Sequence, residues 1–419
     1  MKYNRILGLG TYPIQNPVHG GQRRVAAFKR FYEWSGITYS YACIYNSNYY
    51  KGSDVGADDL KLIVPESEIG LEGVIGDLIS GRQGVSDAAS FQHFMGIVER
   101  LTPDALQLEH PFMWPLAKRL RQTSRARKLP VIYSSHNVEA PLKQGILVSG
   151  GMPPDLRNKI CSEIEALEAE LVHEADFIIC VSASDQEFYY KTKSLSDVVV
   201  VPNGTDRPVK SSMHRSIESL RVFEGRPYLM TVGSAHPPNI DGICSFVIKN
   251  GAFCTPPAKC IAICGGMAAA VRTHPEFQRY HAANSCRVEF FADISDSDLA
   301  VIKQCCHGVL LPISEGGGSN LKTAEALTLG KWVIATSISL RAFEAYANDG
   351  VIVANNPAEF RHAIRQVLQR PPAVISDGDR LARDALYWDR CFVDSELPRL
   401  LQLSAAQTRD EAKHIHINS

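Results

Sequence analysis

The sequence lacks the features that identify several classes of protein. Its 44 Lys and Arg residues are balanced by 45 Asp and Glu residues, so no overall charge favours binding to duplex nucleic acid. No apolar run approaches the roughly 18 residues that a membrane-spanning helix needs. The N-terminal segment has only a short apolar stretch, and no signal peptide is recognised. We therefore expect a cytoplasmic protein with no nucleic-acid partner, for which a peripheral membrane contact stays open.

The 11 cysteines form no recognisable site. Cys260 and Cys264 are separated by three residues, and Cys305 and Cys306 are adjacent, so neither pair has the CxxC spacing of zinc sites. The chain is also much longer than the small secreted domains that depend on disulfides. No Asp-x-Asp sequence is recognised as a metal motif. We expect reduced, packed thiols and no metal site.

What the sequence does contain is a series of short β-branched runs that alternate with helical periodicity. This pattern is typical of βα units and parallel sheets, and 419 residues favour two such domains. The sequence predicts an α/β protein with strands at 6–9, 39–44, 104–108, 130–133, 177–181 and 198–201, and then at 228–233, 260–263, 287–290, 309–311 and 332–335.

The helices and the domain boundaries follow from periodicity and composition. Apolar residues spaced by three or four predict a long helix over 156–171, and Asn356 with Pro357 predicts the start of another. A last helix is expected from about Trp388 to Leu403. The polar stretch 205–226 is typical of a linker. We therefore predict a first domain over 1–205, a second over 206–387, and a C-terminal helix with a polar tail over 388–419.

The strongest local signal is the glycine-rich segment that follows the strand at 309–311. Its three glycines at 316–318 allow a close backbone approach to a ligand, and Ser319 can cap the helix that follows. The amides at that helix start form a phosphate site, to which Lys322 adds a charge. Glu325, on the same helix face, could accept hydrogen bonds from sugar hydroxyls. The alternative is an ordinary turn followed by a Lys322–Glu325 ion pair.

This glycine-rich segment and the helix after it resemble the retaining glycosyltransferases of group 1, which have the GT-B fold. The resemblance is strongest over 300–336, and it continues in order along most of the chain. The matching segments are Gly20-Gly21, Ser135-His136-Asn137-Val138-Glu139, Ala175 to Ser182, Val201-Pro202-Asn203-Gly204-Thr205-Asp206, and Val232 to Asn239.

The resemblance implies two facing Rossmann-like domains with a cleft between them, a C-terminal helix that crosses back, and a nucleotide-sugar bound mainly to the second domain. Glu325 corresponds to the second glutamate of the family motif, which holds the donor ribose. The first glutamate of the motif corresponds to Gly317, with Glu315 displaced by two positions. The Arg and Lys that the family carries near the start of the second domain are absent around 234–241, which leaves Lys322 as the phosphate partner.

The predicted site contains one catalytic residue and ten donor-binding residues. His136, which directly follows the strand at 130–133, is predicted to be catalytic and to touch the donor sugar, with a structural histidine as the alternative. For Glu109 and His110 a structural or cleft-lining role is favoured, and Arg23 and Arg24 are either anion ligands or surface residues. The predicted donor-binding residues are Gly20, Gly21, Gly233, Gly317, Gly318, Ser319, Asn320, Leu321, Lys322 and Glu325.

The function implied is transfer of a hexose-type sugar from a nucleoside diphosphate sugar to a hydroxyl acceptor, with retention, in the synthesis of a cell-surface polysaccharide or other glycan. The acceptor is a glycan, a lipid-linked molecule or another alcohol, and no cofactor or metal is expected. Two alternatives remain, a GT-B nucleotide-sugar epimerase and a non-catalytic nucleotide-sugar-binding relative. A nicotinamide dehydrogenase is disfavoured, because Gly8 and Gly10 lack the third glycine of the fingerprint.

Overall fold

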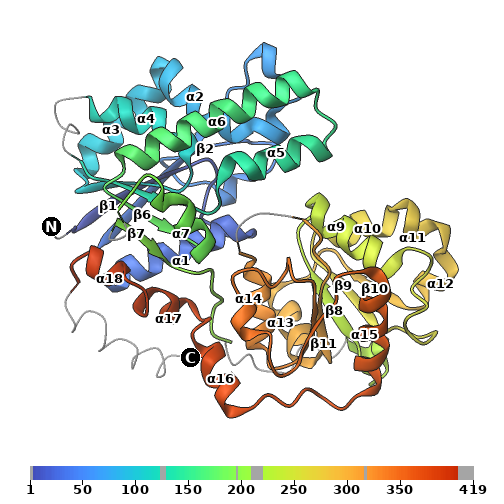
Figure 1. Cartoon of the computed structure of the whole chain (residues 1–419). Helices are drawn as coiled ribbons and strands as arrows, with labels where there is room; N and C mark the ends of the chain where they lie inside the picture. Colours follow the sequence, from blue (N-terminus) through green and yellow to red (C-terminus); the bar gives the residue numbers. More distant parts are fainter. Residues whose placement is uncertain (1–2, 123–128, 195–196, 209–219, 316–318, 404–419) are drawn as a thin grey trace. The chain divides into compact units, whose positions relative to one another are not determined.

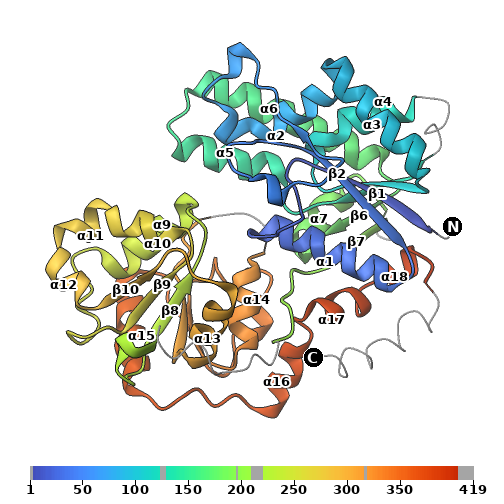
Figure 2. The same cartoon turned by 180° about the vertical axis from the view of Figure 1, so that it is seen from behind.

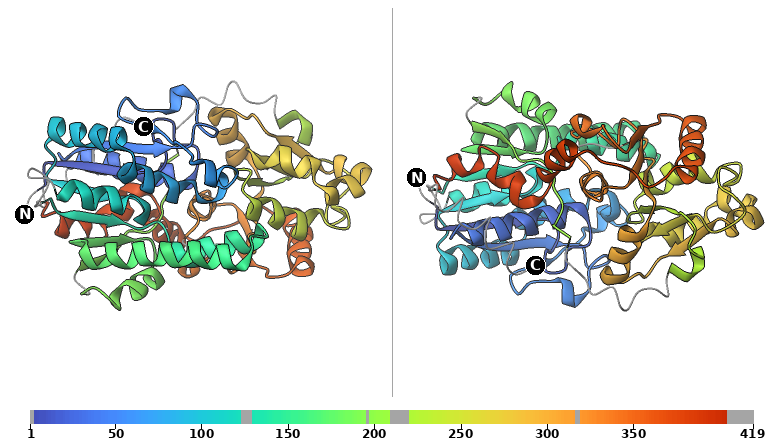
Figure 3. Two further views of the ribbon diagram at one scale, coloured as in Figure 1. Left: turned by 90° about the horizontal axis from the view of Figure 1, so that it is seen from above. Right: turned by 90° about the horizontal axis from the view of Figure 1, so that it is seen from below.

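Two parallel sheets form the centres of two separate units in the computed structural model, which describes residues 3–122, 129–194, 197–208, 220–315 and 319–403 (Figure 1). The first unit extends to Pro202 and resumes at Cys391, and the second spans Asn203–Arg390. The chain thus leaves the first unit once and re-enters it near its end. Figures 2 and 3 show the same units from behind, from above and from below.

The first unit is built on seven parallel strands in the order β3-β2-β1-β4-β5-β6-β7. The strands are β1 (Arg5–Gly10), β2 (Thr38–Tyr45), β3 (Leu60–Lys61), β4 (Ala105–Leu108), β5 (Val131–Ser134), β6 (Phe177–Cys180) and β7 (Val198–Val200). The helices are α1 (Gly20–Trp34), α2 (Glu72–Ser86), α3 (Ala88–Leu101), α4 (Trp114–Arg121), α5 (Glu139–Ser149), α6 (Pro154–Glu174) and α7 (Ala183–Tyr190).

The core of the first unit lies on both faces of this sheet. Strands β4, β5 and β6 are buried along their whole length, because helices cover both faces. Phe94, Trp114 and Leu171 from α3, α4 and α6 pack together on one face. On α1, Phe28 and Phe31 contact Phe392, which belongs to α17 (Trp388–Val393). This aromatic contact fixes the returning chain on the first unit.

The second unit repeats the arrangement with six parallel strands in the order β10-β9-β8-β11-β12-β13. The strands are β8 (Leu229–Val232), β9 (Ile261–Cys264), β10 (Val288–Phe291), β11 (Gly308–Leu311), β12 (Trp332–Ala335) and β13 (Val351–Val353). The helices are α9 (Pro237–Ile243), α10 (Met267–Thr273), α11 (Pro275–Arg279), α12 (His281–Ser285), α13 (Asp296–Cys305), α14 (Leu321–Thr328), α15 (Pro357–Gln369) and α16 (Asp377–Asp384).

Helices cover both faces of the second sheet as well. Met267, Phe360 and Ile364 from α10 and α15 pack on one face, while Leu299 and Ala326 from α13 and α14 pack on the other. In both sheets the strand order reverses at the first strand, between β1 and β4 and between β8 and β11. Open α/β sheets bind their ligands beyond the carboxyl ends of the strands at such a reversal. The fold therefore marks one edge of each sheet as the place to look for a site.

All eleven predicted strands are confirmed within a residue or two at their ends. The long helix is confirmed as α6, and Asn356 caps α15 by accepting from the Glu359 amide. Sequence reasoning missed β3 and β13, whose two and three residues carry no periodicity of their own. The predicted single helix from Trp388 is wrong, because the chain breaks near Ser395 and continues in the short α18 (Leu397–Leu400). The middle of the proposed linker, 209–219, lies outside the described residues.

Candidate active site

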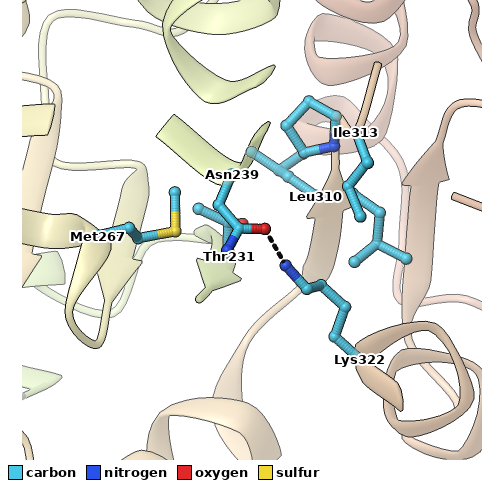
Figure 4. Close-up of a pocket in the computed structure, with 8 residues that line it drawn as sticks. Thr231, Asn239, Met267, Leu310, Ile313 and Lys322 are labelled. Carbon is cyan, nitrogen blue, oxygen red and sulfur yellow. Dashed lines mark hydrogen bonds between the residues drawn. The ribbon is translucent and has the colours of Figure 1, made fainter. Parts of the chain in front are cut away.

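Lys322 lies at the strand-order reversal of the second sheet. It is in the first turn of α14, and its amine donates to Asn239 Oδ1 of α9 at 2.5 Å (Figure 4). A small pocket surrounds this contact beyond the ends of β8 and β11. The lining residues are Thr231, Asn239, Met267, Leu310, Leu311, Pro312, Ile313 and Lys322. The strand ends and the helix start thus bring a cation to the edge that the fold marks.

The surroundings of Lys322 disfavour its charge. Apolar side chains form most of the pocket, and burial lowers the pKa of Lys322 to about 8. The partner that it has, Asn239, is a neutral amide and not a carboxylate. An anionic ligand would supply the missing countercharge, so the site is suited to a phosphate group.

Glu325 lies one helical turn beyond Lys322 but points to a different partner. Its carboxylate forms an ion pair with Lys303 of α13, and both side chains are mostly buried. The expected alternative of a Lys322–Glu325 ion pair is therefore wrong, because each side chain reaches across to another element. A second pocket contacts Lys303, Lys322 and Glu325 together, next to Met230 and Val232. The Glu325 carboxylate and the Lys322 ammonium therefore border the same pocket.

The start of α14 differs from the sequence prediction. Asn320 and not Ser319 occupies the N-cap position, and it makes no side-chain cap. The Ser319 hydroxyl instead accepts from the buried Asn203 amide at 3.0 Å. The amides that begin the helix, at Leu321 and Lys322, still have no acceptor within the helix. Gly317 and Gly318 lie outside the described residues.

Gly233 adjoins the same pocket. A Cβ atom there would lie 3.0 Å from Met267 Sδ and 3.1 Å from Asn239 Nδ2. Since Asn239 holds the Lys322 amine, a side chain at this position would disturb the acceptor. The structure thus places three predicted donor-binding residues, Gly233, Lys322 and Glu325, around one edge of the second sheet.

His136 lies at the matching edge of the first sheet. It follows β5, while Tyr12 follows β1 and Glu109 and His110 follow β4. The His136 ring reaches Glu109 through Nε2 at 3.3 Å and the Tyr12 hydroxyl through Nδ1 at 3.4 Å. The His110 ring reaches Tyr12 through Nε2 at 3.1 Å and Glu139 through Nδ1 at 3.3 Å. Four ionisable groups and one phenol thus form a continuous buried chain.

Gly20 and Gly21 begin α1 directly beside this chain. His19 caps the helix, with the Gln22 side chain completing the capping box. A Cβ atom on Gly21 would lie 2.4 Å from the Tyr12 hydroxyl and 3.5 Å from His136 Nδ1. Glycine at this position therefore leaves room for the Tyr12 hydroxyl next to the imidazole. The structure brings Gly21 and His136 together, although they are far apart in the sequence.

The pKa shifts of these hydrogen-bonded side chains have identifiable causes. Burial, with the neighbouring His110, lowers the pKa of His136 to about 3, although Glu109 acts in the opposite direction. Burial also disfavours the His110 cation, but the bond to Glu139 and the nearby carboxylates outweigh it and raise the His110 pKa. Burial would raise the pKa of Glu109, yet hydrogen bonds from His136, Tyr39 and Gln107 lower it. The surroundings therefore shift the pKa values of the two histidines in opposite directions.

Comparison with known families agrees with this architecture. Residues 226–370 match the family model described as "Glycosyl transferases group 1". The matched segment lies within the second unit. No curated protein matches the chain in a sequence comparison.

Solved structures extend the likeness from this glycosyltransferase domain to the whole chain. Sucrose-phosphate synthase from Thermosynechococcus elongatus matches with a TM-score of 0.66 and 14% identity, over 99% of this chain and 100% of that one. A glycosyltransferase from Rickettsia africae matches with a TM-score of 0.58 and 12% identity, over 100% of both chains. Anabaena HepE, solved with UDP-glucose, matches with a TM-score of 0.56 and 12% identity, over 99% of both. At this identity the likeness shows the fold, which is GT-B.

Three observations bear on the predictions about metal and membrane. Two Asp-x-Asp sequences do occur, at Asp296 and Asp298 and at Asp377 and Asp379, but each lies in the first turn of a helix. No cluster of three or more His, Cys, Asp or Glu side chains suited to a metal is found among the described residues. Nor does any described helix have the length and apolarity to cross a membrane.

Sequence reasoning missed or undervalued several residues at the two edges. Asn239 was quoted only as part of a matching segment, and Tyr12 was not considered. Tyr12 lies two residues after β1, and Asn239 lies in the first turn of α9, the helix that follows β8, and these positions could have drawn attention to them. Of the two arginines, Arg23 is exposed, whereas Arg24 is buried and donates to the Val201 carbonyl at 3.0 Å. Arg24 is therefore not a surface residue, and its burial lowers its pKa to about 10.

Proposed function

We propose that this protein transfers a hexose-type sugar from a nucleoside diphosphate sugar to a hydroxyl acceptor with retention of configuration. The observation that carries the proposal is the Lys322 amine, which is held at the carboxyl edge of the second sheet beside the amides that begin α14, with no carboxylate partner among the described residues. Departure of a nucleoside diphosphate builds negative charge on its phosphates. A desolvated ammonium and a helix start stabilise that charge.

Glu325 completes the proposed donor site. Its carboxylate borders the same pocket as Lys322, one turn further along α14. A ribose offers two neighbouring hydroxyl donors, and charge-assisted hydrogen bonds to them are strong. Anabaena HepE, with the same fold, was solved with UDP and with UDP-glucose, which supports a uridine nucleotide as the first donor to test. Retention rests on the resemblance to the family.

The experiment that tests this function has two steps. Thermal unfolding is first measured with a panel of nucleotides and nucleotide-sugars, because a ligand at 100 times its Kd adds about 2.7 kcal/mol of stability. The best donor is then incubated alone and with alcohol acceptors, and the products are separated. We expect release of the nucleoside diphosphate with a new glycoside when an acceptor is present. An isomerised nucleotide-sugar from the donor alone would instead indicate an epimerase. Binding without turnover would indicate a non-catalytic relative.

A further inference from the structure

The hydrogen bonds at the edge of the first sheet have one consistent assignment of protons when His136 is neutral, as the lowering of its pKa to about 3 by burial indicates. Glu109, as a carboxylate, can only accept, so His136 Nε2 carries the proton that it donates. Neutral His136 then accepts at Nδ1, and the Tyr12 hydroxyl is the donor. The phenol has one proton, so its oxygen accepts from His110 Nε2. His110 therefore donates from both nitrogens, to Tyr12 and to Glu139.

Glu109 is itself fixed in orientation from the other side. Its Oε1 accepts from the Tyr39 hydroxyl at 2.8 Å and from the Gln107 amide at 2.7 Å. The Tyr32 hydroxyl donates to the Gln107 oxygen at 2.6 Å, which orients that amide with its nitrogen toward Glu109. Because two donors occupy Oε1, the carboxylate presents Oε2 to His136.

Two glycines make this support possible. Gly8 of β1 pairs in register with Tyr41 of β2, and a Cβ atom on Gly8 would lie 2.1 Å from the Tyr39 hydroxyl. Any larger residue in that position would push Tyr39 away from Glu109. Gly10 likewise makes room for the Tyr41 hydroxyl, which donates to the Tyr12 carbonyl. The two glycines of Gly8-Leu9-Gly10 thus make room for the hydroxyls of Tyr39 and Tyr41, a role unrelated to dinucleotide binding.

We infer that Glu109 is a positioning residue that fixes His136 with its proton on Nε2, so that Nδ1 is the atom that accepts a hydrogen bond from a hydroxyl of the bound sugar. This inference rests on the proposed function for the presence of a sugar. Nδ1 is the nitrogen on the side of Gly21, where the missing Cβ leaves room for the Tyr12 hydroxyl. In the structure that hydroxyl is the donor to Nδ1, and the sugar hydroxyl would take its place.

The variant Glu109→Gln tests the tautomer directly. Tyr39 and Gln107 both donate to Oε1, so they hold the carbonyl oxygen of the new amide in that place. Its NH2 group then faces His136 Nε2 and can only donate. This forces the ring proton onto Nδ1, where it blocks acceptance from a hydroxyl. The change preserves the size of the side chain, and it should reverse the tautomer and not merely remove a contact.

The measurement is 15N NMR of protein labelled on the histidine rings, with the His136 signals assigned by comparison with His136→Gln. We expect the Nε2–H tautomer in the wild type and the Nδ1–H tautomer in Glu109→Gln. The variant should also lose at least about tenfold in kcat, with a smaller change in the KM for the donor. Asp59→Asn is the matched control, because this partly buried carboxylate accepts from the Cys43 and Gly56 amides and has no contact with His136.

Each outcome decides the matter. An Nδ1–H tautomer in the wild type overturns the inference, whether or not Glu109→Gln folds. A variant that keeps the Nε2–H tautomer overturns it too, with or without loss of activity. If the wild type transfers no sugar, the proposed function fails, while the two spectra still decide whether Glu109 sets the tautomer.

Discussion

The buried ionisable groups at the edges of the two sheets differ in their hydrogen-bond partners. At the first sheet, His136, His110 and Tyr12 form a chain in which each donor has an acceptor, and the carboxylates of Glu109 and Glu139 close its ends. At the second sheet, Lys322 is desolvated against apolar side chains with only a neutral amide as its acceptor. A satisfied network stabilises one arrangement, whereas an uncompensated cation costs stability until an anion arrives. We infer that the hydrogen bonds at the first edge orient the two histidines. We also infer that the desolvated Lys322 at the second edge favours the binding of an anionic donor.

The sharpest test of this contrast is Lys322→Met. Loss of a charge-assisted hydrogen bond to phosphate should cost about 1.5–3 kcal/mol of donor binding, or roughly 10-fold to 100-fold in Kd. The free energy of unfolding should stay the same or rise, because the desolvated ammonium is gone. Titration calorimetry and thermal unfolding measure the two effects. Lys259→Met is the control, since Lys259 is paired with Glu289 at 2.7 Å and should leave donor binding unchanged. A variant that binds normally would exclude Lys322 from the donor site.

The pH dependence should separate binding from folding. Because the pKa of Lys322 is lowered to about 8, the amine loses its proton in the folded state before it does so in the unfolded chain. The unfolded state then binds more protons, so the Lys322 contribution to the free energy of unfolding rises between about pH 8 and pH 10.5. Donor affinity should fall over the same range, by at most about tenfold per pH unit. Calorimetry at pH 7, 8 and 9 checks this. Equal slopes in wild type and Lys322→Met would contradict it.

Removing one hydroxyl from the first edge should have the opposite effect on stability. Tyr12→Phe leaves His136 Nδ1 and His110 Nε2 without their shared partner. A buried group without its hydrogen bond costs about 1–3 kcal/mol, so unfolding should become easier by that amount. Urea unfolding followed by tyrosine or tryptophan fluorescence measures the change. Tyr49→Phe, at an exposed position, is the control. If Tyr12→Phe is as stable as the wild type, the chain of hydrogen bonds does not stabilise the fold.

Glu325→Gln distinguishes a ribose ligand from a structural ion pair. If Glu325 accepts from the ribose, nucleoside diphosphate and its sugar conjugate should both bind roughly tenfold more weakly, equivalent to about 1.4 kcal/mol. Lys303→Gln removes the same ion pair but leaves the carboxylate. The two variants should therefore lose similar stability, while the loss of affinity is confined to Glu325→Gln. Equal affinities in the two variants would reduce Glu325 to a partner of Lys303.

The sequence revealed the strands well because a parallel sheet covered on both faces imposes continuous apolar runs, such as Phe177 to Cys180. It also singled out Lys322, Glu325 and His136 through their segments of family resemblance, and their roles stay predictions. It could not give their partners. Lys303 lies 22 positions before Glu325, and Glu109 lies 27 before His136, so tertiary packing alone brings them together. The alternative based on spacing along one helix, a Lys322–Glu325 ion pair, is wrong for this reason.

The smallest expected effect concerns metal. At the second edge an ammonium and a helix start supply the positive charge that a divalent cation would otherwise bring to a diphosphate. We therefore predict that dialysis against EDTA changes the transfer rate by less than about twofold. The reason is that groups of the protein supply the largest electrostatic contribution to the reaction. The rate is compared before dialysis, after it, and after addition of Mg²⁺ or Mn²⁺. Lys322→Met is the informative comparison, because a divalent cation can replace the lost charge, and we expect Mg²⁺ to restore part of the donor affinity of this variant. Complete loss of wild-type activity with EDTA, reversed specifically by one cation, would show that Lys322 and the α14 amides do not suffice. The contrast between the two edges would then have to include a bound ion at the second.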